Sequence, residues 1–225
     1  MKKEPSAIVL VSGGMDSCLC TALEIESGEK PALMHVNYGQ RTQSKEYECF
    51  RKIARHYGIK KTLVVDSQAE KKIGGSSLLK GHGKVPPARF EKGEVPSTYV
   101  PFRNGIMLAY ATAWAEAIGA VRVVYGAMET DSSGYPDCTA RFARAFENAV
   151  TAGTKAGSEI KIVTPLIKMT KMEIVEIGTG INAPFNLTWS CYSKSDRACG
   201  KCESCVLRLK GFQMAGVKDP LRYVK

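Results

Sequence analysis

The segment with the clearest chemistry is SGGMDS at residues 12–17, which directly follows the apolar run Ile8–Val11. A buried strand, a glycine turn and a helix start together make an anion site, because the backbone can approach closely and the first helical N–H groups point at the anion. The hydroxyls of Ser12 and Ser17 add donors. Asp16 offers a carboxylate that suits Mg²⁺ beside a pyrophosphate. The segment therefore predicts a phosphate site.

Two common phosphate-binding motifs do not describe this segment, because it lacks both the GK[ST] ending of a Walker A loop and the GxGxxG fingerprint. It resembles the PP-loop of ATP pyrophosphatases, which cleave ATP between the α and β phosphates and transfer AMP. The alternative is an ordinary strand-to-helix turn capped by Asp16 or Ser17. The resemblance implies ATP binding by seven residues: Val11, Ser12, Gly13, Gly14, Met15, Asp16 and Ser17.

A second group with chemical potential is the cysteine block near the end of the chain. Cys191, Cys199, Cys202 and Cys205 fall within CYSKSDRACGKCESC, where CGKCESC contains two interlocked CxxC units. Four thiolates at this spacing suit a closed, structural zinc site. An Fe–S cluster and redox-active thiols are the alternatives. The other cysteines (Cys18, Cys20, Cys49 and Cys138) are scattered, and we interpret the first three as packing residues.

Composition narrows the class of protein. With 225 residues and 44% hydrophobic content, the chain fits one α/β domain with an appendage. No apolar run approaches the ~20 residues of a membrane helix, and no signal-peptide pattern follows the N-terminal lysines, so we expect a cytoplasmic protein. The net charge of +10 is consistent with nucleic-acid binding, but we favour a basic enzyme that handles ATP and pyrophosphate.

Apolar runs and helical patterns alternate along the chain, which predicts a doubly wound, mostly parallel five-stranded sheet. In such sheets ligands bind at the carboxyl ends of the strands, where SGGMDS would lie. The predicted strands are Ala7–Val11, Ala32–Val36, Lys61–Val65, Val121–Tyr125 and Glu159–Val163. The predicted helices are Asp16–Ser27, Thr42–Tyr57, Gly105–Ile118, Arg141–Ala156 and Thr170–Ile177.

Three further expectations concern organisation. We predict a nucleotide-binding α/β domain at residues 1–165 and a C-terminal helical segment with the zinc site at 166–225. Residues 105–118 are apolar nearly all round, which predicts a well-buried helix. Residues 74–98 are too rich in Gly and Pro for regular structure, so we expect a functional or mobile loop.

Further motifs identify a family resemblance. SGGMDS, YGQR at 38–41, STYVPFRN at 97–104, SGYPDC at 133–138, TPL with TKMEI, and the four-cysteine block occur in this order. This layout is similar to that of the 7-cyano-7-deazaguanine synthase (QueC) family of queuosine and archaeosine synthesis, over nearly the whole chain. The resemblance implies a PP-loop, adenine nucleotide alpha hydrolase-like fold.

The resemblance also implies an activity. The family converts 7-carboxy-7-deazaguanine and ammonia to the nitrile, using ATP and Mg²⁺, through an acyl adenylate and an amide. The cysteines would then hold structural Zn²⁺. The family suggests a homodimer. The sequence contains no glutaminase domain, so free ammonia or a partner would supply the nitrogen.

Individual residues carry over from the family motifs. Gln40 and Arg41 would contact ATP. Asn104 has the alternative role of a helix cap, and Gly134–Asp137 the alternative role of a turn with a structural tyrosine. We interpret Lys168 and Lys171 as surface charges, although they could meet phosphates. The residues expected to bind substrate are Arg103, Asn104, Asp131, Tyr135 and Asp137.

The chain departs from the family around SGYPDC. The family reads like GVNAVDY before this motif and RPEF after it, whereas this chain has GAMETDS and TARF, with Met128, Ser132 and Thr139 at substituted positions. Adenylation is thus a safer prediction than the acceptor. The alternatives are a diverged QueC-like enzyme that transfers a deazaguanine acyl group to a protein, or a PP-loop tRNA-modifying enzyme. A zinc-ribbon binding module does not fit the complete SGGMDS segment.

Overall fold

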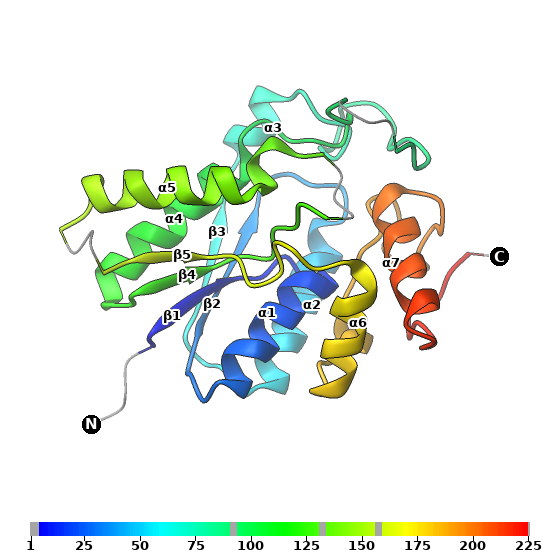
Figure 1. Ribbon diagram of the computed structural model, residues 1–225. Coiled ribbons are helices and arrows are strands. Elements are labelled where there is room, and N and C mark those ends of the chain that lie inside the picture. The colour runs from blue at the N-terminus through cyan, green and yellow to red at the C-terminus, as the bar shows by residue number, and fades with distance from the viewer. Residues whose placement is uncertain (1–4, 91–93, 131–133, 156–158, 225) are drawn as a thin grey trace.

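The architecture is a single parallel sheet between two layers of helices (Figure 1). The computed structural model describes residues 5–90, 94–130, 134–155 and 159–224. All pairings in the sheet are parallel, in the order β3-β2-β1-β4-β5. The predicted doubly wound sheet is confirmed, and each predicted strand lies close to an observed one. The strands are β1 Ala7–Leu10, β2 Ala32–Asn37, β3 Thr62–Asp66, β4 Arg122–Val124 and β5 Lys161–Val163.

Alternation of side chains along β1 divides the core into two layers. Ala7 and Val9 belong to the cluster that includes Leu19 and Phe50, whereas Ile8 packs with Leu108 on the opposite face. Helices α1 and α2 thus cover one face, and α4 and α5 the other (Figure 1). The helices before the C-terminal segment are α1 Met15–Glu26, α2 Gln43–His56, α3 Ala69–Ile73, α4 Arg103–Ile118 and α5 Ala140–Gly153.

The expectation of a well-buried helix at residues 105–118 is wrong. Only one face of α4 is buried, with Leu108 and Ala111 fully enclosed against the sheet, while Ala109, Ala113 and Ala117 are exposed. The helix lies in an outer layer, so its far side meets solvent (Figure 1). Alanine is a strong helix former and is small enough to be tolerated on either side, and for this reason the pattern misled.

The C-terminal segment packs on the first helical layer. It comprises α6 Lys171–Gly180, the 3₁₀ turn η2 Phe185–Leu187 and α7 Glu203–Met214. Helix α6 begins at a capping box in which Thr170 and Glu173 exchange hydrogen bonds. Ile174 and Phe212 share a hydrophobic cluster with Val9. The division into segments 1–165 and 166–225 stays a prediction.

The Gly/Pro-rich segment after α3 has no helix or strand among its described residues, as expected, yet it is attached to the domain. Leu79 is fully buried and bridges Gln40, and the Ser77 N–H donates to the Ser97 carbonyl at 2.7 Å. Farther along, the Ala88 N–H donates to the Lys201 carbonyl at 2.8 Å. The short elements α3, η1 (Pro136–Cys138) and η2 were not predicted.

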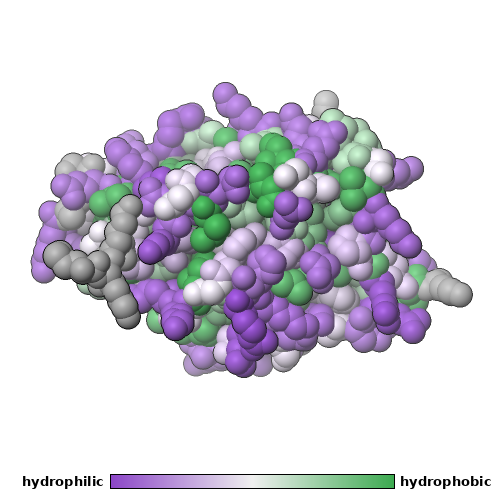
Figure 2. Space-filling model, turned by 90° about the horizontal axis from the view of Figure 1, so that it is seen from below, coloured by the Kyte–Doolittle hydropathy of each residue, from purple (hydrophilic) through white to green (hydrophobic). Residues whose placement is uncertain are grey.

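None of the helices in the described residues combines the length and apolar character needed to span a bilayer. On the face shown in Figure 2, hydrophilic side chains cover most of the surface, and hydrophobic ones lie between them in small groups.

Candidate active site

The loop between β1 and α1 has the geometry of an anion site. Gly13 adopts φ +88°, and a Cβ there would lie 2.6 Å from the Glu46 carbonyl oxygen, so only glycine fits. The Ser12 and Ser17 hydroxyls lie 3.2 Å apart, and Ser12 Oγ accepts from the Gly14 N–H. Helix α1 starts at Met15, directly after this turn. Its first N–H groups are therefore directed at the space above the sheet.

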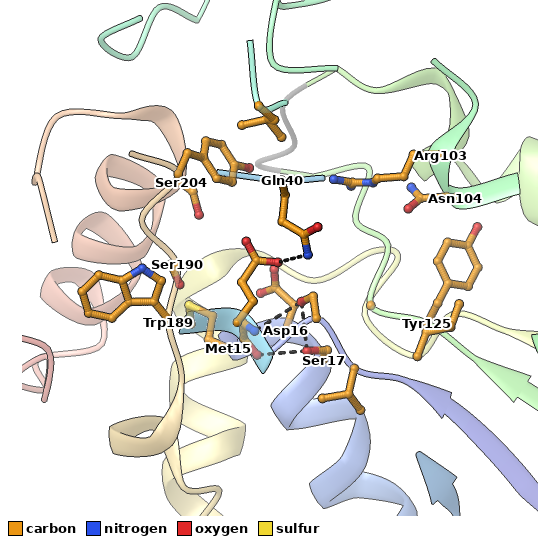
Figure 3. Close-up of a pocket in the computed structure, with 18 of the residues that line it drawn as sticks. Met15, Asp16, Ser17, Gln40, Arg103, Asn104, Tyr125, Trp189, Ser190 and Ser204 are labelled. Atoms are coloured by element: carbon orange, nitrogen blue, oxygen red, sulfur yellow. Dashed lines mark hydrogen bonds between the residues drawn. The ribbon is translucent and has the colours of Figure 1, made fainter. Parts of the chain in front are cut away.

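Asp16 points into this space and is paired with a lysine from a distant element. Lys171 Nζ lies 2.6 and 2.7 Å from the two Asp16 carboxylate oxygens (Figure 3 shows Asp16). Lys171 is only 8% exposed, so its interpretation as a surface charge is wrong. Its burial follows from the packing of α6 on α1, which the local sequence does not reveal. Lys168, in contrast, is exposed.

Gln40 and Arg41 line the cavity while bonding to the protein itself. The Gln40 amide accepts from the Tyr38 N–H at 2.8 Å and donates to Glu46 at 3.2 Å. Arg41 Nε donates to the Ser77 carbonyl at 2.7 Å, and its guanidinium also bonds the Gly83 carbonyl. Arg41 thus holds the Gly/Pro-rich loop against the cavity.

Arg103 and Asn104 lie across the cavity from Asp16 and Ser17, at the start of α4 (Figure 3). Arg103 Nη1 donates to the Tyr38 hydroxyl at 3.0 Å, and its guanidinium carbon is 5.4 Å from the centre of that ring. Burial raises the pKa of Tyr38 to about 12, so the phenol is neutral and accepts this bond. The arrangement presents a fixed cation to the cavity.

The SGYPDC segment contributes two different roles. Tyr135 lines the cavity and donates its hydroxyl to Thr98 Oγ1 at 2.9 Å. Asp137 lies behind the wall, where its carboxylate accepts the Asn104 N–H at 2.9 Å and thereby caps α4. Burial raises the pKa of the Asp137 carboxyl. Asp131 lies outside the described residues, as does Ser132.

The walls enclose a cavity of about 250 Å³ at the carboxyl ends of β1, β2 and β4. The C-terminal segment forms one wall, which sequence reasoning missed. The main-chain N–H of Trp189 donates to the Gly13 carbonyl at 2.8 Å, and the residue is 5% exposed. The signal in the sequence that could have pointed to Trp189 is its position two residues before Cys191. The cavity residues outside the predicted set include Lys171, Trp189, Ser190, Tyr192, Ser204 and Arg208.

Three cysteine thiols near the site are suited to packing rather than to nucleophilic chemistry. Burial raises the pKa of Cys18 to about 12 and that of Cys49 to about 11. Cys138 lines the cavity, and burial likewise raises its pKa to about 12. Because the thiolate is the nucleophile, these thiols are poorly reactive at neutral pH.

The four C-terminal cysteines converge. The sulfur atoms of Cys191, Cys199, Cys202 and Cys205 all lie within 4.8 Å of one another. A Zn–S distance of about 2.3 Å places four tetrahedral thiolates about 3.8 Å apart, so the cluster fits zinc with a small contraction. Hydrogen bonds from the Cys202 and Cys205 thiols, followed by main-chain N–H donors, lower the pKa of Cys191. The donor set could therefore bind zinc.

Comparisons with known proteins agree with this geometry. The family model described as "Queuosine biosynthesis protein QueC" matches residues 6–216. The chain belongs to the QueC family. Relatives named 7-cyano-7-deazaguanine synthase include that of Chlorobaculum parvum, 51% identical with 96% of both chains covered, and that of Koribacter versatilis, 49% identical with 96% of this chain and 92% of the relative covered.

Solved structures show the fold at much lower identity. NMN synthetase from Francisella tularensis matches with a TM-score of 0.50 and 12% identity, covering 96% of this QueC-family chain and 79% of the synthetase. At this identity the match supports the architecture alone. The overall fold is thus shared with an enzyme that differs in most of its sequence.

Proposed function

We propose that the protein is an AMP-forming ligase that converts 7-carboxy-7-deazaguanine and ammonia to 7-cyano-7-deazaguanine. The carrying observation is the complete anion loop beside a cavity with a fixed cation, in a chain about half identical to named synthases over 96% of its length. ATP would bind through Val11–Ser17, with Gln40 and Arg41 near it. Arg103, Asn104 and Tyr135 would face the acid. Asp137 would act through Asn104.

The family resemblance implies the following reaction. A carboxylate oxygen of the acid attacks the α-phosphorus of ATP and pyrophosphate leaves, giving the acyl adenylate. Ammonia displaces AMP to form the amide. The amide oxygen then attacks the α-phosphorus of a second ATP and pyrophosphate leaves, after which departure of AMP with that oxygen and loss of the two amide protons give the nitrile. Donors at the first turn of α1 would stabilise the leaving pyrophosphate, and Arg103 would hold the acid.

Two metal ions fit the residues present. The Asp16 carboxylate and the Ser12 and Ser17 hydroxyls are oxygen ligands of the kind that Mg²⁺ prefers. When bound, Mg²⁺ would neutralise phosphate charge. The four cysteines would hold Zn²⁺ as a closed structural site, because all four positions are filled by protein. We also propose that the protein is a cytoplasmic homodimer, and light scattering of the purified protein tests this assembly. Ammonia would be supplied either free or by a partner.

The decisive experiment is mass spectrometry of the purified protein with MgATP, ammonium and 7-carboxy-7-deazaguanine. Nitrile formed together with AMP supports the proposal. Turnover of ATP that does not depend on the acid, with no nitrile formed, contradicts it. A reaction without the acid and one without ammonium are the controls, and the latter should accumulate acyl adenylate.

One observation keeps a second candidate open, an enzyme that transfers the deazaguanine acyl group to a protein. Met128, at a substituted family position, lines the cavity. Thr139, the other described substitution, instead caps α5 by accepting the Phe142 N–H at 3.0 Å, so it has a structural explanation. Adenylate or amide without nitrile in the same experiment would favour this candidate.

A further inference from the structure

The side chain of Tyr125 carries an unpaired polar group at the wall of the cavity. Tyr125 directly follows β4, is 4% exposed and lines the cavity. Its hydroxyl is buried and has no hydrogen-bond partner among the described residues. Buried polar groups are almost always paired, so an unpaired one needs an explanation. In Figure 3 this hydroxyl is directed toward the side of the cavity where Arg103 and Asn104 lie.

The tyrosine is held in place, so its hydroxyl oxygen cannot move to a partner within the protein. The main-chain N–H of Tyr125 donates to the Val163 carbonyl at 3.1 Å. Its ring belongs to the hydrophobic cluster that includes Leu108 of α4. A Cβ on the next residue, Gly126, would lie 3.2 Å from the Asp16 Cβ, so the chain is also packed against the anion loop. The free protein therefore carries the desolvation cost of this hydroxyl.

The surroundings of the hydroxyl select the kind of ligand group that can pair with it. Burial raises the pKa of Tyr125, and the nearby Cys138 and Asp137 raise it further, so the phenol is neutral at neutral pH and can donate a hydrogen bond. The Asp137 carboxylate disfavours a phosphate in this corner, because both are negative. A neutral carbonyl oxygen meets no such repulsion. The deazaguanine ring carries one carbonyl oxygen of this kind.

We propose that Tyr125 is a substrate-binding residue whose hydroxyl donates to the ring carbonyl oxygen of 7-carboxy-7-deazaguanine. This inference rests on the proposed function and assigns a contact to the ring, in addition to those of Arg103, Asn104 and Tyr135. The hydroxyl gains its partner only when the acid binds. Because a buried donor is left unpaired by a ring without the carbonyl, Tyr125 also selects against such rings.

The test is calorimetric binding to the full chain, first of α,β-methylene-ATP alone and then of the acid in its presence. Tyr125→Phe removes only the hydroxyl. It should weaken binding of the acid about tenfold, the loss of one hydrogen bond, and leave the affinity for α,β-methylene-ATP unchanged. The melting temperature of the free protein should rise, because the buried unpaired group is gone.

Tyr57→Phe is the matched control. Tyr57, at the C-terminal end of α2, has the other buried tyrosine hydroxyl without a partner among the described residues, and it does not line the cavity. This variant should also raise the melting temperature, but neither affinity should change. The two variants together separate relief of an unpaired hydroxyl from loss of a substrate contact.

A change in the ligand identifies the oxygen. The 2-amino-7-deazapurine-7-carboxylic acid lacks the ring carbonyl, so the unmodified protein and Tyr125→Phe should bind it equally. Three results would overturn the proposal: unchanged affinity of Tyr125→Phe for the acid, equal weakening of α,β-methylene-ATP, or a lower melting temperature, which would show that the hydroxyl is already paired. Failure of the unmodified protein to bind the acid at all would instead contradict the proposed function, and this inference with it.

Discussion

At the residue scale, two features require glycine at position 13: a left-handed backbone conformation, and a neighbouring atom too close to allow a Cβ. We expect Gly13→Ala to lower the melting temperature and to weaken ATP binding at least about tenfold, since positive φ costs roughly 1–2 kcal/mol and overpacking roughly 1–3 kcal/mol more. The added Cβ would meet the Glu46 carbonyl oxygen at 2.6 Å. Thermal unfolding and calorimetry measure the two effects.

Gly28→Ala is the matched control for this variant. Gly28 has φ +78°, but no atom lies within 4 Å of the position that an added Cβ would take. It should therefore show the backbone cost without the steric cost, and ATP affinity should not change. Equal losses of stability in the two variants, with ATP affinity intact in both, would show that the loop tolerates a side chain.

At the residue scale, the sequence is most informative where local geometry decides the conformation. The SGGMDS turn contains its own signals, namely glycines, hydroxyls and a helix start. The role of Lys171 depends on α6 folding back against α1, over a separation of 155 residues. Arg41 lines the cavity and Asp137 lies behind its wall, and their hydrogen bonds go to backbone groups of distant segments. No local pattern encodes such contacts.

At the element scale, the contact between α6 and α7 passes through Gly211. Alanine would favour the helix by up to about 1 kcal/mol relative to glycine, but its Cβ would lie 2.7 Å from the Lys171 carbonyl oxygen, a backbone atom. We expect overpacking to win, so Gly211→Ala should lower the free energy of unfolding by about 1–3 kcal/mol, as measured by urea denaturation.

Gly180, the last residue of α6, provides the comparison. No atom lies within 4 Å of a Cβ built there, so Gly180→Ala should be neutral or stabilising. Destabilisation of both variants to the same extent would mean that helix ends, and not the α6–α7 contact, set the cost.

Helices and strands were predictable where the spacing of apolar residues shows which face of the element is buried and which is exposed. The strands have alternating or continuous apolar runs, and their parallel pairing follows from the alternation of strands and helices. The failure at α4 has a clear cause, because a helix rich in alanine carries no information on which side solvent lies. The short α3, η1 and η2 are set by contacts of the surrounding loops and leave no periodic signal.

At the scale of the whole molecule, the cysteine cluster joins parts of the chain that are distant in sequence. Lys201, between two of the cysteines, accepts the Ala88 N–H, and Trp189 reaches Gly13. We expect Cys202→Ser to abolish zinc binding and to lower hydrogen-exchange protection at residues 185–208 and in the 12–17 loop. The central strands should stay protected, because their hydrogen bonds lie within the sheet.

Elemental analysis and mass-detected hydrogen exchange measure these effects. The Cys138→Ser variant loses a thiol outside the cluster, so the protein should retain zinc at the four C-terminal cysteines. Full retention of metal by Cys202→Ser, or loss of protection throughout the sheet, would contradict the assignment of the cluster as a local tie.

The Trp189–Gly13 hydrogen bond also has a consequence for protein synthesis. The loop that would receive ATP leaves the ribosome before the wall that supports it, because residues 12–17 precede residues 189–208 in the chain. The sheet strands can pair before residues 189–208 exist, but the pocket cannot close. The order of translation therefore delays completion of the pocket until the residues that support the loop have been synthesised.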